Sequence, residues 1–462
     1  MLEALTLLVF GKGASGALLF LCFTASAAVL YVDANSPGPS PPYDDWSIAA
    51  TVIQDAVDAA APGDLVLVTN GTYQTGGSPG IRVDVRKPIT LQSVNGPGVT
   101  VIQGQQNNYP GDTNLHCVYL VDGATVAGFT LNQGGIRQPP PGYPTTSEGG
   151  SVWCQSVNSV VSNCFLFGNR ALNGGAAYRG TLVNCVVSNN GSGGVYRSVL
   201  KNCLVVENGG STWGGAAYCT LINCTVSHNT GFAQASGAYY CAATNSVLYF
   251  NQGFSGVSNY YAGTLDHCCT WPLPASGVGN FSNDPMFVSY SADVNLHLRS
   301  NSPCINAGRN SYVPAAPDLD GNPRIAGGTV DVGAFEFQAP ASVISYAWLQ
   351  QYHLAIDGTA DYADPDGEGM NNWQEWICGT IPTNALSVLR LSSLAADPLG
   401  IAVTWQSVSN RSYFLERATD LGSQQPFAPV ATGIIGQPVS VTYFDTNAIG
   451  PGPFFYRVGV EQ

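Results

Sequence analysis

The chain has 462 residues, of which only 10% are charged and 54 are glycine. This length allows two to four domains, and the composition favours a β-rich extracellular protein with many tight turns over a helical cytosolic enzyme. The formal net charge of −14 argues against nucleic-acid and anionic-membrane partners, because their phosphates need basic patches.

The N-terminus predicts an export signal. An apolar stretch ends in small residues, "GALLFLCFTASAA", and Ala25-Ser26-Ala27 fits an A-x-A cleavage site. The apolar run is short for a membrane span, so a membrane anchor is the weaker interpretation. We therefore expect a signal peptide over residues 1–27, secretion or cell-surface display, and no transmembrane segment after signal removal.

A short helix is expected near the start of the mature chain. In "SIAATVIQDAVDAAAPGD" the apolar residues recur at helical spacing and Pro-Gly follows as a stop. Such a helix can cover the open end of a stack of strands, where exposed edges invite aggregation. The next segments, among them "PGDLVLVTNGTY" and "CVYLVDGATVAGFTLNQGG", predict short strands separated by glycine and asparagine turns.

The middle of the chain repeats every 18–22 residues. Each repeat carries the pattern of "LVNCVVSNN", which aligns Asn163, Asn184, Asn202, Asn223 and Asn245. A period near 20 residues indicates a solenoid, and the strand-like runs with turns between them predict a parallel β-helix over residues 28–282.

The apolar positions of each repeat change phase at this first asparagine, which predicts a corner. Asparagine tolerates the left-handed conformation that a corner needs. A second set, Asn169, Asn190, Asn208, Asn229 and Asn251, is expected to mark the next corner. Cys164, Cys185, Cys203 and Cys224 share one inward position; buried free thiols are the favoured interpretation, and disulfides remain the alternative.

The opening "IQDAVDAAAPGDLVLVTNGTY" and the repeats resemble the right-handed parallel β-helix (pectin-lyase-like) superfamily. Residues 283–338 resemble a choice-of-anchor Q domain through "DPMF", "SPCINAG", "DLDGNPR" and "DVGAFE". This second resemblance implies the end of a surface-protein β-helix and no defined chemistry. We expect Asp318, Arg324, Asp331 and Glu336 to form a structural polar network there, with a cation at Asp318 and Asp320 as the alternative.

The coils offer little for catalysis, and no catalytic residue is assigned. Glycoside hydrolysis needs paired carboxylates, but residues 151–262 contain one carboxylate, Glu207. A metal-free polysaccharide lyase or related carbohydrate-active enzyme survives as the alternative function. Its candidate bases are the outward cations Arg179, Arg197, Lys201 and His228, but solvated or tyrosine-stacked cations without a catalytic role are the favoured interpretation.

A sharper chemical pattern lies in "DPDGEGMNNWQE". It places oxygen ligands, a turn glycine and a backbone carbonyl at the positions of an EF-hand-like calcium loop, which resembles thrombospondin type 3-like or dockerin-like modules. The predicted Ca²⁺ ligands are Asp364, Asp366, Glu368, Met370 (backbone carbonyl), Asn372 and Glu375. Glu368 departs from the usual Asp or Asn. Helices are expected on both sides, within a linker and calcium module over residues 339–387.

The tail, residues 388–462, alternates apolar and polar residues and predicts a small antiparallel β-sandwich that loosely resembles fibronectin type III. The predicted fold class is therefore all-β: a right-handed parallel β-helix with an N-terminal capping helix, a helix–calcium loop–helix module and a terminal sandwich. The predicted function is a non-catalytic, monomeric, secreted or cell-surface protein that binds polysaccharide or surface glycans and uses Ca²⁺ for stability.

Overall fold

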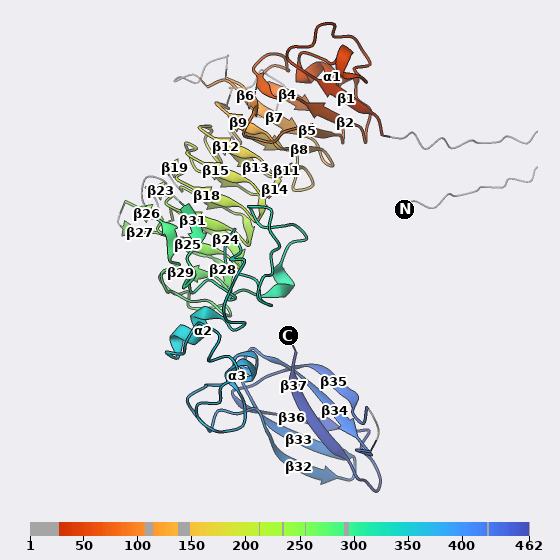
Figure 1. The fold of residues 1–462 in the computed structure, drawn as a ribbon, viewed down its shortest axis with the longest axis vertical. Coiled ribbons are helices and arrows are strands. Elements are labelled where there is room, and N and C mark those ends of the chain that lie inside the picture. The colour runs from red at the N-terminus through yellow and green to blue at the C-terminus, as the bar shows by residue number, and fades with distance from the viewer. Residues whose placement is uncertain are drawn as a thin grey trace, which may run out of the picture.

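The structure is a computed structural model that describes residues 27–461 except 107–113, 137–147, 212, 233–234, 255, 291–294 and 423–424. The predicted signal peptide over residues 1–27 lies almost entirely outside the described residues. Within the described part of the chain, no helix is long and apolar enough to cross a membrane. Figure 1 shows an elongated stack of strands with a separate pair of sheets at its C-terminal end.

Three columns of parallel strands build the stack, which confirms the prediction of a parallel β-helix. The first column consists of β4 (Ile81–Val85), β7 (His116–Leu120), β10 (Val152–Cys154), β13 (Ala177–Tyr178), β16 (Val195–Tyr196), β20 (Ala216–Ala217), β24 (Ala238–Thr244) and β28 (Tyr260–Asp266). The second consists of β1 (Val29–Val32), β2 (Leu65–Val68), β5 (Thr90–Ser93), β8 (Thr125–Ala127), β11 (Val160–Ser162), β14 (Thr181–Val183), β17 (Val199–Lys201) and β21 (Thr220–Ile222). The two columns join at β24, which is long enough to pair with both β20 and β21.

The third column consists of β3 (Gly71–Tyr73), β6 (Thr100–Gln103), β9 (Thr130–Asn132), β12 (Phe165–Phe167), β15 (Val186–Ser188), β18 (Leu204–Val206), β22 (Thr225–Ser227), β25 (Val247–Tyr249) and β29 (Cys269–Thr270). A fourth set of short strands lies in the turns between the third and first columns: β19 (Gly209–Gly210), β23 (Thr230–Gly231), β26 (Gln252–Gly253) and β27 (Gly256–Val257). At the N-terminal end, α1 (Ile53–Ala59) buries Ile53, Ala56 and Val57 in the same core as the first coils, beside a short 3-10 turn (Trp46–Ile48).

The corner between the second and third columns is made by asparagine, as the phase change predicted. Asn163, Asn184, Asn202, Asn223 and Asn245 all have φ between 48° and 52°. At the corner after the third column, the left-handed residue is the one before the second asparagine, for example Glu207 with φ 57° and His228 with φ 55°.

The second asparagines form a buried ladder. The Nδ2 of Asn190 donates to the Oδ1 of Asn208 over 2.9 Å, and Asn208 donates to Asn229 over 2.9 Å. The same contact continues from Asn169 to Asn190, from Asn229 to Asn251 and from Asn251 to Asn259. Each step satisfies a polar side chain that would be costly to bury alone, so the ladder fixes the register of successive coils.

The repeated cysteines line the interior as free thiols. All twelve cysteines of the described chain are unpaired and buried. The Sγ of Cys185 donates to the carbonyl oxygens of Val161 and Val183, and Cys203 makes the equivalent pair of contacts. Burial raises the pKa of Cys164 and Cys268 to about 12, so these thiols are neutral wall residues.

Residues 283–338, here called the closing segment, cover the asparagine corner of the last coils. They contain the antiparallel pair β30 (Phe287–Ser289) and β31 (Asn295–Leu298) and a 3-10 turn (Asn310–Tyr312). The amides of Asn184 and Asn202 donate to the carbonyl of Pro317, and Asn245 exchanges hydrogen bonds with Arg309. The corner asparagines therefore bind the closing segment more than they bind one another.

The predicted polar network lies inside this segment. Asp318, Arg324, Asp331 and Glu336 are all at most 6% exposed. The Asp331 carboxylate accepts hydrogen bonds from the backbone amides of Asn306 and Phe337. The Glu336 carboxylate accepts hydrogen bonds from the backbone amides of Ala326 and Asp331. These side chains hydrogen-bond the backbone of the closing segment itself, as a structural polar network does.

Beyond the closing segment come α2 (Tyr346–Gln351), α3 (Asn372–Cys378) and two antiparallel sheets. One sheet has the order β32 (Leu391–Asp397), β33 (Gly400–Ser407), β36 (Val439–Asp445), and the other has β35 (Ala428–Ile435), β34 (Ser412–Ala418), β37 (Phe455–Val460). Trp405 and Tyr413 are fully buried between them.

Candidate functional site

The corner between the first and second columns carries large outward side chains. On four successive coils the left-handed residue is Arg179, Arg197, Tyr218 and Tyr240, and we call this set the corner strip. Both arginines are exposed, and the two tyrosines are 44% and 47% exposed. A left-handed conformation is uncommon for such residues, so the corner turns each of them away from the core at the same place in its coil.

A column of aromatic rings lies directly beside the corner strip. Tyr178, Tyr196, Tyr239 and Tyr261 stand on the outer side of the first strand column. The register puts Ala217 between Tyr196 and Tyr239, which would leave a gap. Trp213 fills it from the preceding turn, with ring centroids 5.5 Å from Tyr196 and 5.9 Å from Tyr239 and nearly parallel planes.

Side chains of the corner strip contact the neighbouring column of aromatic rings. The guanidinium of Arg179 lies 4.9 Å from the ring centroid of Tyr178, and that of Arg197 lies 5.2 Å from Tyr196. Tyr218 meets the rings of Tyr196 and Tyr239 edge-on. The result is a continuous outer surface over four coils, with cations at one end and tyrosines at the other.

Arg197 and His228, two of the candidate bases, lie in different surroundings. The neighbouring tyrosines raise the pKa of Arg197, so its guanidinium stays protonated. Burial lowers the pKa of His228, but its ring contacts Ser227 and it lies at the opposite corner, after the third column. Glu207, the single carboxylate of residues 151–262, accepts a hydrogen bond from Asn189 at that same opposite corner.

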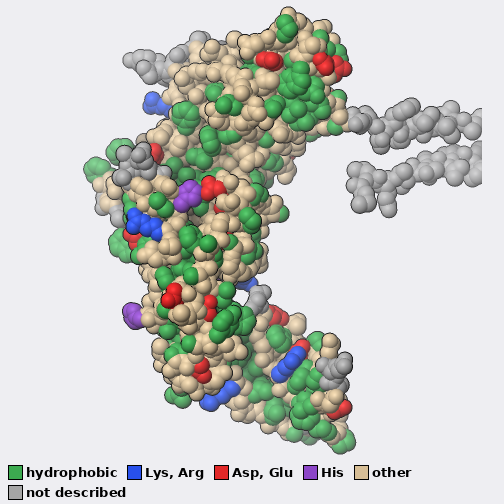
Figure 2. Space-filling model, viewed as in Figure 1, with side chains coloured by type: hydrophobic (Ala, Val, Ile, Leu, Met, Phe, Trp, Pro, Cys, Tyr) green, Lys and Arg blue, Asp and Glu red, His purple; other side chains and the backbone are tan. Residues whose placement is uncertain are grey.

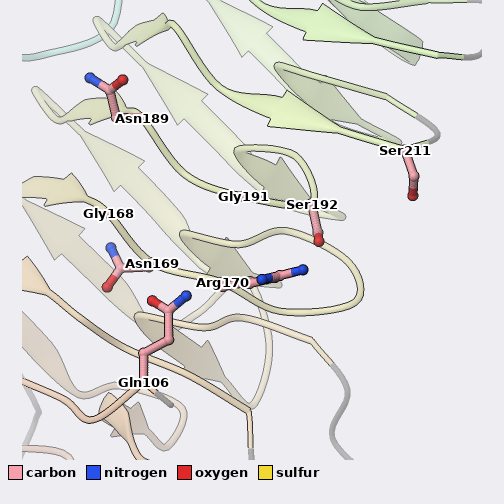
Figure 3. A pocket seen from close by; sticks show the side chains of 8 residues that line it. All are labelled: Gln106, Gly168, Asn169, Arg170, Asn189, Gly191, Ser192 and Ser211. Atoms are coloured by element: carbon pink, nitrogen blue, oxygen red, sulfur yellow. The ribbon is translucent and has the colours of Figure 1, made fainter. Parts of the chain in front are cut away.

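An open polar depression of about 460 Å³ lies on the turns after the third column, and Figure 3 shows its lining. Arg170 extends beside Ser192 there, while Asn189 points away from both. The lining residues Gly168, Asn169 and Gly191 are turn residues of the solenoid, and Asn169 belongs to the asparagine ladder. Arg170 is the single charged side chain of this lining.

The acidic loop of residues 364–375 brings three of the predicted calcium ligands together. Ligand atoms of Asp364, Asp366 and Glu368 lie within 4.8 Å of one another. The carboxylate of Asp364 also accepts the amides of Gly367 and Gly369, two glycines with positive φ that make the tight turn. Glu375 projects from the first turns of α3 and is fully buried.

Buried oxygens without partners make this loop unlike an ordinary acidic turn. Both carboxylate oxygens of Asp366, Glu368 and Glu375 and the Oδ1 of Asn372 are buried and accept no hydrogen bond. Burial and the neighbouring carboxylates raise the pKa of Glu375 to about 7, and they raise that of Glu368 as well. A hard cation with several oxygen ligands would satisfy all of these groups, so the donor set fits Ca²⁺.

The surroundings of the loop differ from an EF-hand in one respect. The helix α3 begins inside the loop, as expected for the second flank, and an Asn371–Gln374 capping box starts it. The first flanking helix, α2, ends at Gln351 and is separated from Asp364 by an irregular segment. The side chain of Asn372 donates to the carbonyl of Ala360 and thereby fixes the loop's two ends to each other.

No family model matches the chain, and no curated protein sequence matches it. Solved structures that are similar to parts of this chain include a pectate lyase at 17% identity, covering 68% of this chain and 97% of that one, with a TM-score of 0.42. A pectin methylesterase in complex with a hexasaccharide has 10% identity, coverage of 60% and 100%, and a TM-score of 0.33. The pectin methylesterase of rice weevil has 9% identity, coverage of 49% and 68%, and a TM-score of 0.27. These likenesses concern the parallel β-helix fold alone.

Proposed function

We propose that this protein is a non-catalytic, secreted or cell-surface β-helix scaffold that binds a glycan chain along its corner strip. The observation that carries the proposal is the strip itself: two guanidinium groups and two half-exposed tyrosines repeat at one position of four successive coils. Such bulky side chains are not needed to turn a corner, for which asparagine or glycine serves better.

The chemistry of the strip suits a polysaccharide. Tyrosine combines an apolar ring with a hydroxyl, and a guanidinium donates several hydrogen bonds in one plane, so together they match the C–H faces and hydroxyls of sugars. Neighbouring coils are separated by the strand spacing of about 4.8 Å. A linear chain that runs along the solenoid axis would meet the same corner again on each coil.

Binding to a glycan array, followed by calorimetry with the best ligand, tests the proposal. We expect Tyr218→Ala combined with Tyr240→Ala to weaken binding at least tenfold. Tyr362→Ala is the matched control, because Tyr362 is 68% exposed but lies in the acidic loop region. Binding to no glycan, or equal loss in the control, would contradict the assignment. Formation of unsaturated, ultraviolet-absorbing products from a polyuronate would instead favour the alternative, a metal-free lyase.

The second part of the proposal is that Ca²⁺ stabilises the C-terminal module through the acidic loop. Asp364, Asp366, Glu368, Asn372, Glu375 and the backbone of Met370 would hold the ion. Titration with terbium, followed by luminescence sensitised by nearby tryptophans, would report binding directly, and excess calcium should displace it. A melting temperature that is the same in calcium and in chelator would count against this part alone.

A further inference from the structure

The acidic loop lies between the β-helix and the C-terminal sandwich, and the residue Asp361 just before it is fixed to the β-helix side. The buried carboxylate of Asp361 accepts a hydrogen bond from the Ser342 hydroxyl over 2.6 Å and from the Val343 amide over 3.0 Å. The carbonyl of Ser342 accepts a hydrogen bond from the side-chain amide of Asn306, which belongs to the closing segment. The entry to the loop is therefore continuous with the end of the solenoid.

The start of α3 is fixed to the same side. The Trp373 amide donates to the carbonyl of Asp361. Trp373 and Trp376 pack against the buried cluster of Ile344, Leu349 and Ala360. These contacts involve no loop carboxylate, so they persist whether or not a cation is bound.

Arg411 hydrogen-bonds the end of α3 to the sandwich. The guanidinium of Arg411, from the turn before β34, donates to the carbonyl of Trp376 over 3.2 Å. Its Nε lies 2.8 Å from the place where a Cβ on Gly379 would stand, so a side chain at this helix end would displace the guanidinium. Gly379 also has φ 76°, which ends the helix in the left-handed conformation.

Glu375 connects the cation site to this contact. Its carboxylate is close enough to Asp366, Glu368 and Asp364 for their charges to act on it, while its carbonyl accepts hydrogen bonds from the backbone amides of Gly379 and Thr380 that end α3. A backbone shift at Glu375 that takes its carboxylate away from the other acids would therefore move the helix end that Arg411 contacts. A cavity of about 230 Å³ lies beside it, lined by residues of the α3 end such as Ile381 and by sandwich residues such as Val439, so the joint has room to rearrange.

We propose that cation occupancy of the acidic loop sets the orientation of the sandwich on the β-helix. The contact between Arg411 and the end of α3 couples the cation site to the sandwich. This inference rests on the proposed calcium site. With the cation bound, Glu375 is held in the loop and the end of α3 presents a fixed surface to Arg411. Without it, the repulsion among Asp364, Asp366, Glu368 and Glu375 loosens the helix end, and the sandwich samples a wider range of orientations.

Small-angle X-ray scattering of the full chain in calcium and in chelator tests this. We expect a narrow distance distribution in calcium and a broader one, with a larger radius of gyration, in chelator. Arg411→Ala should keep its terbium luminescence but scatter in calcium as the unmodified protein does in chelator. Arg390→Ala, an exposed arginine of the same sandwich, is the matched control and should behave as the unmodified protein.

The outcomes separate the two proposals. Terbium binding with identical scattering in calcium and chelator would overturn the orientation proposal and leave the calcium site intact. Absence of binding would overturn the calcium site itself. An Arg411→Ala protein whose scattering still responds fully to calcium would show that another contact carries the coupling, and would refute the role of Arg411.

Discussion

The replacement Glu375→Gln should largely abolish the effect of calcium on the stability of α3. Glu375 is buried, neither of its side-chain oxygens accepts a hydrogen bond, and it faces three other carboxylates. In chelator a neutral amide of the same shape removes this repulsion. In calcium the same change removes a ligand, so one substitution stabilises one state and destabilises the other.

The magnitude follows from the electrostatics of the site. Burial and like charges raise the pKa of Glu375 from 4.5 to about 7, which corresponds to roughly 3 kcal/mol if unscreened. Because Asp364 is exposed, solvent screening reduces this to about 1–2 kcal/mol. A raised pKa makes the penalty absent below about pH 4.5 and complete above about pH 7. Calcium at a hundredfold excess over its dissociation constant would stabilise the unmodified loop by about 2.7 kcal/mol.

Hydrogen exchange of the α3 amides is the suitable assay, because it reports local opening. At pH 8 in chelator we expect Glu375→Gln to exchange about tenfold more slowly than the unmodified protein, and in calcium about tenfold faster. Glu207→Gln, on an exposed corner of the β-helix, is the control and should change neither value. Faster exchange in chelator for Glu375→Gln would refute the idea that unopposed repulsion dominates the empty loop.

Three further predictions concern the solenoid. Asn208→Ala should destabilise the coils by about 3 kcal/mol in urea unfolding, because it leaves buried partners of the ladder unsatisfied. The closing segment should lose roughly 2–4 kcal/mol of stability as the pH rises from about 4 to 8, because the pKa values of Asp331 and Glu336 are raised to about 7 and about 8. Hydrogen exchange of residues 302–337 at the two ends of this pH range would measure the loss. Trp213→Ala should lower stability by about 2 kcal/mol in thermal unfolding through the gap in the aromatic column, and adding Ala217→Tyr should restore part of the loss.

The repeating part of the fold could be predicted because its physical causes are local. A corner needs a residue that tolerates positive φ, and Asn163 and its equivalents stand at the phase change of the apolar pattern. The clustering of Asp364, Asp366 and Glu368 was predictable for the same reason, since these residues are close in sequence. At the other asparagine corner, the left-handed residue is instead a neighbour such as Glu207 or His228, whose residue types give no such signal.

Contacts between distant segments could not be predicted in this way. Arg411 contacts α3 across 35 residues, and nothing in its own neighbourhood marks it. The placement of Trp213 in the aromatic column had a weak signal: an alanine stands where the other coils have tyrosine, and a tryptophan precedes it by four residues. Recognising it requires the register of the coils, which the irregular turn lengths hide.

The corner strip poses an energetic question that one substitution can answer. A non-glycine residue in the left-handed conformation costs about 1–2 kcal/mol, and stacking of Arg197 on Tyr196 returns about 0.5–1 kcal/mol at an exposed site. Stability alone therefore gives little reason to keep arginine at this corner, whereas ligand binding does. Arg197→Asn should leave the free energy of unfolding within about 0.5 kcal/mol, because the strain relieved offsets the stacking lost, yet weaken glycan binding severalfold. A large loss of stability with unchanged binding would mean that the arginine serves the fold and that the ligand lies elsewhere on the solenoid.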